Sequence, residues 1–217
     1  MKKRIISALC VAIAGLVVIP AAASNDPDIS TTDEWGENIQ EYVDVIDGND
    51  ETIEKSLVTA DDGEIILPQT EIDMAKDFYL TSGYEEKEAE ELAVQYVKEI
   101  NVLYQEAIAN GYTVTDEEIQ EHLDELKKQY EAAENKDEIH AFMSKFENEQ
   151  AYWDFQFEML KKDLPIQKYN AAREQEFIEE QTVNDNPDEK LKAQEEWEDE
   201  FESQKEDAVE EYDFSIE

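Results

Sequence analysis

The residues best suited to metal chemistry are the two histidines of this sequence, and neither has the neighbours that a metal site needs. Glu118 and His122 are one helical turn apart, as are Asp137 and His140. A zinc or di-iron site needs further ligands at matching spacing, and the sequence around these pairs does not supply them. We therefore interpret both histidines as solvated helix residues and expect neither a metal nor a cofactor.

Other catalytic patterns are missing as well. With only 6 glycines, the chain has no phosphate-binding glycine loop and no Gly-x-Ser-x-Gly elbow. The acidic turns at 47–51 and 61–64 lack the alternating oxygen ligands and the distal Glu of a calcium loop. Carboxylates are too numerous for any pair to stand out as acid and base. The sequence predicts no catalytic residues and a protein that is not an enzyme.

The charge of the chain limits the kinds of molecule that it can bind. Its 217 residues include 18 Lys and Arg against 58 Asp and Glu, a net charge of −40. Nucleic acid is excluded as a partner because phosphate binding needs a basic surface. The acidity either provides solubility, including in a salty medium, or forms a repulsive coat that keeps a sticky protein dispersed. A hydrophobic fraction of 41% with only 5 prolines favours a helical fold with a real core.

The N-terminus has the pattern of an export signal. Basic residues at 2–4 precede an uncharged apolar run at 5–19, and the small residues 21–23 suit cleavage before Ser24. The run is short for a membrane span, so we expect a cleaved signal, with an uncleaved anchor as the alternative. The only cysteine, Cys10, lies within it. The sequence thus predicts a secreted protein or one at the extracytoplasmic face of the envelope, with membrane contact only through an uncleaved signal.

A helix from 85 to 110 is the expected frame of the fold. Its apolar residues from Ala89 to Ile108 follow the spacing of one buried stripe, and Gly111 can end it in the left-handed conformation. Thr115 and Glu118 have the spacing of a capping box that starts the next helix, expected at 116–133.

Upstream of this frame, the sequence predicts one small β-hairpin. The β-like runs 57–59 and 65–67 flank Asp62-Gly63, a typical hairpin turn. Thr70, with Asp73 three residues later, resembles a capped start for a helix that runs to Thr81 and ends at Gly83.

Downstream, the sequence predicts a short helix at 136–146 and then an aromatic helix beginning at Asn148. The aromatic helix has two apolar faces: Trp153, Phe157, Leu160 and Leu164 on one, and Tyr152, Phe155, Met159 and Ile166 on the other. Either both faces are buried between neighbouring helices, or one lines an open apolar groove for a partner. Pro165 should kink or end the helix near Leu164.

The last helix is expected to begin at Asn186-Pro187, which combines a cap with proline at the first helical position. Its apolar stripe, Trp197, Phe201, Ala208 and Tyr212, must pack back on the rest of the chain. The expected organisation is a signal peptide at 1–23, an acidic leader with a short helix at 24–50, a helical domain at 51–181, and a linker with the C-terminal helix at 182–217. The expected fold class is mainly α, with long amphipathic helices and one small β-hairpin.

The run from the hairpin TADDGEIIL, through TEIDMAKDF, to NVLYQEAIANGYTVTDEEIQEHL resembles the N-terminal domain of the SurA/PrsA family, over about residues 54–180. Members of this family are extracytoplasmic chaperones and parvulin-type foldases, and the helical part is also similar to trigger-factor-like chaperones. The resemblance implies a SurA-like helical domain on which the final helix packs back. The export signal agrees with it independently.

The chain departs from this family in one respect. Full-length members carry a parvulin prolyl isomerase domain between the helical part and the final helix, whereas only residues 181–187 separate them here. The resemblance therefore implies the chaperone part without isomerase activity, and the missing parvulin stretch opposes the hypothesis of an active isomerase.

From these patterns the sequence predicts an exported chaperone that binds unfolded or newly secreted polypeptides through an apolar groove. Met and aromatic side chains adapt to many shapes, which suits weak binding of varied clients. The alternative is an exported helical adaptor that binds one specific envelope or secretion partner. The residues predicted to contact clients, all of which could equally belong to the core, are Phe142, Met143, Tyr152, Phe155 and Met159.

Overall fold

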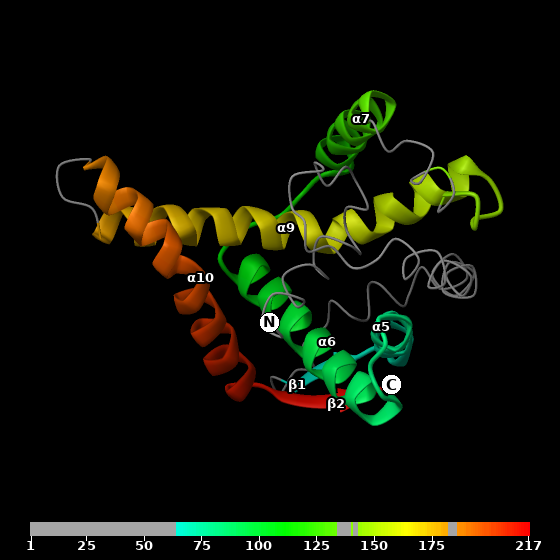
Figure 1. Cartoon of the computed structure of the whole chain (residues 1–217), viewed down its shortest axis with the longest axis horizontal. Helices are drawn as coiled ribbons and strands as arrows, with labels where there is room; N and C mark the ends of the chain where they lie inside the picture. The colour runs from blue at the N-terminus through cyan, green and yellow to red at the C-terminus, as the bar shows by residue number, and fades with distance from the viewer. Residues whose placement is uncertain (1–63, 134–139, 141–142, 182–185) are drawn as a thin grey trace.

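The computed structural model describes residues 64–133, 140, 143–181 and 186–217, and in this part the fold is mainly helical, as predicted. The elements follow the chain in the order shown in Figure 1. They are β1 (Glu64–Leu67), α5 (Gln69–Thr81), α6 (Glu86–Ala109), α7 (Asp116–Ala132), α9 (Glu149–Gln181), α10 (Pro187–Glu210) and β2 (Asp213–Ile216). The predicted leader helix at 24–50 and most of the predicted helix at 136–146 lie outside the described residues.

Helix α6 is the central element, as its apolar pattern predicts. The six consecutive residues from Glu99 to Tyr104 are all buried, so the helix is enclosed on every side along this stretch. Its neighbours are α5, α9, α10 and β1. After Asn110 the chain leaves the helix at Gly111, whose φ of +84° lies in the left-handed region that favours glycine. The predicted stop is thereby confirmed.

The start of α7 is also as predicted. The Thr115 hydroxyl accepts a hydrogen bond from the Glu118 N–H at 3.2 Å, and the Thr115 N–H donates to the Glu118 carboxylate at 2.9 Å. Together these bonds form the capping box. The buried residues of α7 are Ile119, Leu123 and Leu126, one stripe that packs against the rest of the fold.

The predicted start of α5 is wrong. The helix begins at Gln69 with Pro68 in the N-cap position, and no side chain caps it. Pro68 has no side-chain acceptor for the free N–H groups of the first turn, and the N–H of Gln69 donates instead to the Glu217 carbonyl at 2.9 Å. Thr70 consequently lies within the first turn. The predicted end is confirmed, because Gly83 has a φ of +87°.

The sheet differs from the predicted hairpin. β1 was expected to be the second strand of the hairpin, but it pairs in parallel with β2 at the C-terminus. Ile65 lies opposite Phe214, and Leu67 lies opposite Ile216. The other predicted strand of the hairpin, 57–59, lies outside the described residues. The last helix was expected to include Tyr212, but it ends at Glu210, because the chain turns there into β2.

Helix α9 passes through Pro165 instead of ending there. Pro165 lies at the midpoint of this 33-residue helix, and Figure 1 shows that α9 changes direction along its length. Proline has no N–H to bond the carbonyl of Lys161, so the helical ladder is interrupted at this point. The sequence predicted that the helix either kinks or ends near Leu164, and of these two alternatives the structure agrees with the kink.

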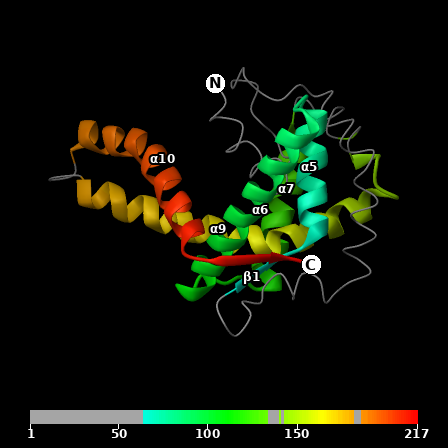
Figure 2. The same ribbon diagram turned by 90° about the horizontal axis from the view of Figure 1, so that it is seen from below.

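Pro165 also divides α9 between two parts of the molecule. The half before it packs in the hydrophobic core, which comprises buried residues of β1, α5, α6, α7 and α9 as far as Ile166. We call this part, with β2, the body. The half after it lies beside α10, and both views show these two helices projecting from the body (Figures 1 and 2). We call residues 167–181 and 186–204 the arm.

The start of α10 is as predicted. The Asn186 side chain accepts a hydrogen bond from the Asp188 N–H at 3.1 Å, and Pro187 occupies the first helical position. Beyond the arm, α10 returns to the body and packs on α6 before β2 joins β1. The final helix thus packs back on the rest of the chain.

Candidate functional site

The residues predicted to contact clients lie mostly in the core. Met143, Tyr152 and Phe155 are only 1–3% exposed. Met159 is half-buried, and Phe142 lies outside the described residues. In this conformation, therefore, at most Met159 of the four described residues offers surface to a partner.

Aromatic packing explains why these residues are enclosed. The ring of Phe146 lies 5.2 Å from that of Tyr152 and 5.6 Å from that of Phe155. Tyr152 also meets Trp153 edge-on at 4.9 Å. Such edge-to-face contacts are favourable beyond the area they bury. Of the two alternatives for the aromatic helix, burial of both faces agrees with the structure, with Phe157 and Met159 remaining half-exposed.

The arm carries aromatic residues that are less enclosed. The ring of Trp197 lies 5.5 Å from Phe177 on α9 and is stacked on Phe201 at 5.4 Å. Phe177 and Phe201 are half-exposed, while Trp197 is buried between them. Neither Phe177 nor Trp197 belongs to the main core. We call these three residues the arm cluster, in which two of the three rings keep part of their surface exposed.

The arm cluster lies in strongly acidic surroundings. The arm contains twelve Asp and Glu residues but only four basic ones. The guanidinium of Arg173 lies 5.3 Å from the ring of Tyr169 and donates a hydrogen bond to Gln204, so it joins the two arm helices. A surface of half-exposed aromatic rings among carboxylates can take up apolar side chains and, beside them, basic ones.

A buried ion pair holds α10 to α6. The Lys205 ammonium lies 3.1 Å from the Glu99 carboxylate, with side chains only 7% and 10% exposed, and 3.1 Å from Glu202. Burial disfavours the charge on Lys205, but the Glu99 and Glu202 carboxylates outweigh this effect and raise its pKa. Two turns further along α6, the Glu106 carboxylate accepts a hydrogen bond from the Tyr212 hydroxyl at 2.9 Å. Burial and this bond raise the pKa of Tyr212 to about 12.

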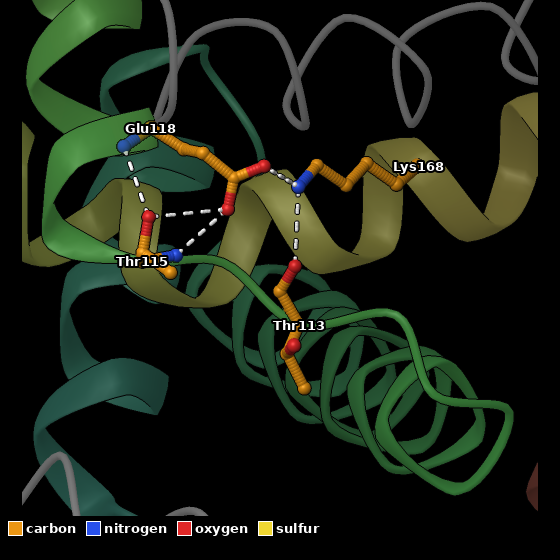
Figure 3. A network of polar contacts seen from close by, with 4 residues as sticks. All are labelled: Thr113, Thr115, Glu118 and Lys168. Atoms are coloured by element: carbon orange, nitrogen blue, oxygen red, sulfur yellow. Dashed lines mark hydrogen bonds and ion pairs between the residues drawn. The ribbon is translucent and has the colours of Figure 1, made fainter.

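A second polar contact joins the arm to the start of α7. Figure 3 shows Lys168 reaching from α9 to the Glu118 carboxylate at 2.6 Å and to the Thr113 carbonyl at 3.1 Å. Glu118 also accepts the N–H of Thr115 in the capping box, and these contacts, Lys168 first, lower its pKa. One carboxylate thus fixes both a helix start and the position of α9 beside it.

A third group of polar side chains lies where α5, α6 and α9 meet. The Lys162 ammonium is 2.6 Å from the Glu71 carboxylate, which also accepts a hydrogen bond from the Asn101 amide at 3.2 Å. The neighbouring Asp163 carries a buried Oδ2 oxygen, and burial raises the pKa of its carboxyl to about 7. We call these four residues the junction cluster.

The described residues hold no group of three His, Cys, Asp or Glu side chains that could bind a metal. None of the helices in this part of the chain is long and apolar enough to span a bilayer. What these residues offer is therefore an acidic surface with a half-exposed aromatic cluster, together with buried charges that join helices.

Sequence reasoning did not single out the arm cluster or the junction cluster. Trp197 and Phe201 were assigned to the stripe of the last helix, but nothing local indicates that Phe177 contacts them. A weak signal for the junction cluster does exist, since the charged run 161–163 lies between the apolar residues Leu160 and Leu164. The burial of the last two residues of this run depends on α5 and α6, which the sequence alone does not place.

Comparisons with known proteins assign the chain to no family. No family model matches it, and neither curated proteins nor solved structures include a significant match.

Proposed function

We propose that the protein is an exported chaperone that binds unfolded or newly secreted polypeptides without catalysing a reaction on them. The observation that supports this most is the return of the chain's end to the body, where α10 packs on α6 and β2 pairs with β1. A final helix that packs back on a helical domain is what the resemblance to SurA/PrsA chaperones implies. The export pattern at residues 1–23 agrees with the same proposal.

The proposed contact surface is the arm cluster, extended by Met159 on the body. Phe177 and Phe201 expose part of their rings, and exposed aromatic surface binds apolar segments of unfolded chains by removing both from water. Bound clients are withdrawn from the pool of free unfolded chains, so their aggregation slows by mass action. The surrounding carboxylates keep the complex soluble and favour clients with basic residues near their apolar segments.

The test is an aggregation assay with protein recovered after export. A chemically unfolded, unrelated client is diluted with and without the protein while light scattering is followed. We expect suppression near one-to-one stoichiometry, and loss of most of it in a variant with Phe177→Ser and Phe201→Ser. Leu80→Ser is the matched control, because Leu80 is a large apolar residue on α5 that is 37% exposed and lies outside the arm.

Circular dichroism must show that both variants retain their helices. Absence of suppression for several unrelated clients contradicts a chaperone. Equal suppression by the arm variant and the Leu80 control contradicts the arm as the contact surface. A proline-peptide isomerisation assay should show no activity, in accord with the missing parvulin stretch.

One observation favours an exported adaptor as a second candidate. Among the described residues, the large apolar side chains that are exposed, namely Leu80, Ile108, Leu191 and Ile216, lie on four different elements. Apolar residues distributed over different elements do not make up the contiguous patch that varied unfolded chains need, whereas one defined partner can also be recognised through polar and charged contacts. An adaptor would bind a single envelope or secretion protein tightly and leave the aggregation of unrelated clients unchanged, so the same assay separates the two functions.

A further inference from the structure

The junction cluster contains a carboxylic acid in an unusual position. Asp163 lies two residues before Pro165, at the centre of α9. Part of the residue reaches the surface, but its Oδ2 oxygen is buried and has no hydrogen-bond partner in the described part of the chain. A buried carboxylate oxygen without a donor is costly when charged, and much less so when the group is protonated.

The neighbouring charges do not remove this cost. Lys162 forms its short ion pair with Glu71 on α5, not with Asp163. The charge of Glu71 acts on Asp163 in the opposite sense to that of Lys162. From α6 the cluster receives Asn101, an uncharged amide that donates to Glu71 and to the Val97 carbonyl. Lys162, the cation that acts on Asp163 within the described part of the chain, is therefore already paired with another carboxylate.

Burial consequently raises the pKa of Asp163 to about 7, with Lys162 opposing and Glu71 adding to the shift. The carboxyl then changes its charge within the neutral pH range, where an ordinary aspartate with a pKa of about 4 stays ionised. This change takes place beside the ion pair that links α5 to α9.

We propose that Asp163 is a proton switch: when it ionises, the packing of α5 and α6 against the middle of α9 loosens, and the aromatic core opens to polypeptide. The last clause rests on the proposed function. Pro165 places the interruption of the helical ladder next to the switch, so α9 resists a local change least at this point. Tyr152 and Phe155, which sequence analysis predicts to contact clients, are buried on the same helix and would become accessible from the body side.

The sign of the pH dependence follows from the raised pKa. A folded-state pKa above the unfolded value means that the native protein binds the proton more tightly. The resulting stabilisation is complete below the unfolded pKa of about 4 and is lost as the pH rises through about 7. The switch therefore closes the body in acid and loosens it at neutral and higher pH.

The test compares the exported protein with Asp163→Asn and with Asp154→Asn, an exposed aspartate on the same helix, as the matched control. Thermal midpoints and binding of a hydrophobic fluorescent dye are measured from pH 5.0 to 8.5. Protonation of the many surface carboxylates affects all three proteins alike. Only a difference in how the thermal midpoint changes with pH therefore reports on Asp163. We expect the midpoint of Asp163→Asn to exceed that of the parent by on the order of 5 °C at pH 8, and this excess to shrink as the pH falls toward 5.

Dye binding should rise with pH in the parent and in Asp154→Asn but stay low in Asp163→Asn. If the thermal midpoint depends on pH in the same way in the parent and in Asp163→Asn, the proposed switch is wrong. A direct check is a carbon-13 titration of the side-chain carboxyls, with the Asp163 signal assigned by its loss in Asp163→Asn. A titration midpoint near 7 supports the switch, and one near 4 overturns it.

Aggregation assays at pH 5.5 and 8.0 separate this proposal from the proposed function. If the thermal midpoints and the dye binding behave as expected while no client is protected at either pH, the switch stands and the chaperone proposal fails. If clients are protected equally at both pH values by the parent and Asp163→Asn, the chaperone stands and the switch does not regulate it.

Discussion

The body and the arm are built from the same helix but are stabilised in different ways. In the body, the first half of α9 is enclosed by α5, α6 and α7, and its aromatic residues meet several other rings. In the arm, the second half of α9 has α10 as its neighbour, and the contact includes three rings, with Trp197 stacked on Phe201 and tilted against Phe177. The body therefore derives its stability from buried area, whereas the arm depends on a few contacts and on charges that anchor it.

This difference shows in which part of such an acidic chain aromatic rings can stay partly exposed. In the body, most aromatic rings are buried in the hydrophobic core that the described residues form. Phe177 lies outside the main core and can keep part of its ring exposed, whereas the half-buried Phe201 also packs against that core. The two halves meet at Pro165, next to the junction cluster, so the mechanical boundary and the proposed proton switch coincide.

The largest effect is expected for truncation of a body aromatic. Phe155→Ala removes a ring that is 3% exposed and contacts Phe146 at 5.6 Å. Deletion of a buried Phe side chain costs about 3–5 kcal/mol, because apolar burial is lost and a cavity remains. Urea unfolding followed by circular dichroism measures this loss. A cost below about 1 kcal/mol would show that the body is not the main source of stability.

A somewhat smaller effect is expected for the ion pair that anchors α10. Lys205→Met leaves the Glu99 carboxylate buried without its cation, which costs about 3 kcal/mol. The double variant Lys205→Met with Glu99→Leu should recover much of this loss, because an apolar pair of similar volume needs no counter-charge. Additive losses in a double-mutant cycle from urea unfolding would contradict a coupling between these two residues.

The smallest effect is expected in the arm. Phe177→Ala removes a half-exposed ring, so the loss should be about 1 kcal/mol and confined to the arm. Hydrogen exchange should show faster exchange of arm amides, with those of α6 unchanged. If Phe177→Ala destabilises the protein as much as Phe155→Ala does, the arm is part of the body and the distinction between them fails.

The features predictable from the sequence are those decided by neighbouring residues. The Thr115–Glu118 capping box, the glycine stops at 83 and 111 and the Asn186-Pro187 start depend on residues a few positions apart. The β1–β2 pairing was not predictable, because nothing near Ile65 indicates that it faces Phe214. Parallel pairing between distant segments is decided by the packing of all the helices between them.

The predicted client residues illustrate the same limit for the site. Periodicity identifies the two apolar faces of α9, but it does not say which neighbours cover them. Tyr152 and Phe155 are enclosed because Phe146 and the helices around α9 converge on them. Asp163 could not be recognised as distinctive among 58 acidic residues until α5 and α6 were placed around it.

The most direct test of the central claim is hydrogen exchange of the exported protein with and without an unfolded client. At pH 5.5 the Asp163 carboxyl is neutral and the body is closed, so binding is confined to the arm. We predict slower exchange of the amides at 172–181 and 187–201 when the client is present, with the α6 amides at 99–104 unchanged. Unchanged exchange in the arm, under conditions in which the client is bound, would contradict the account.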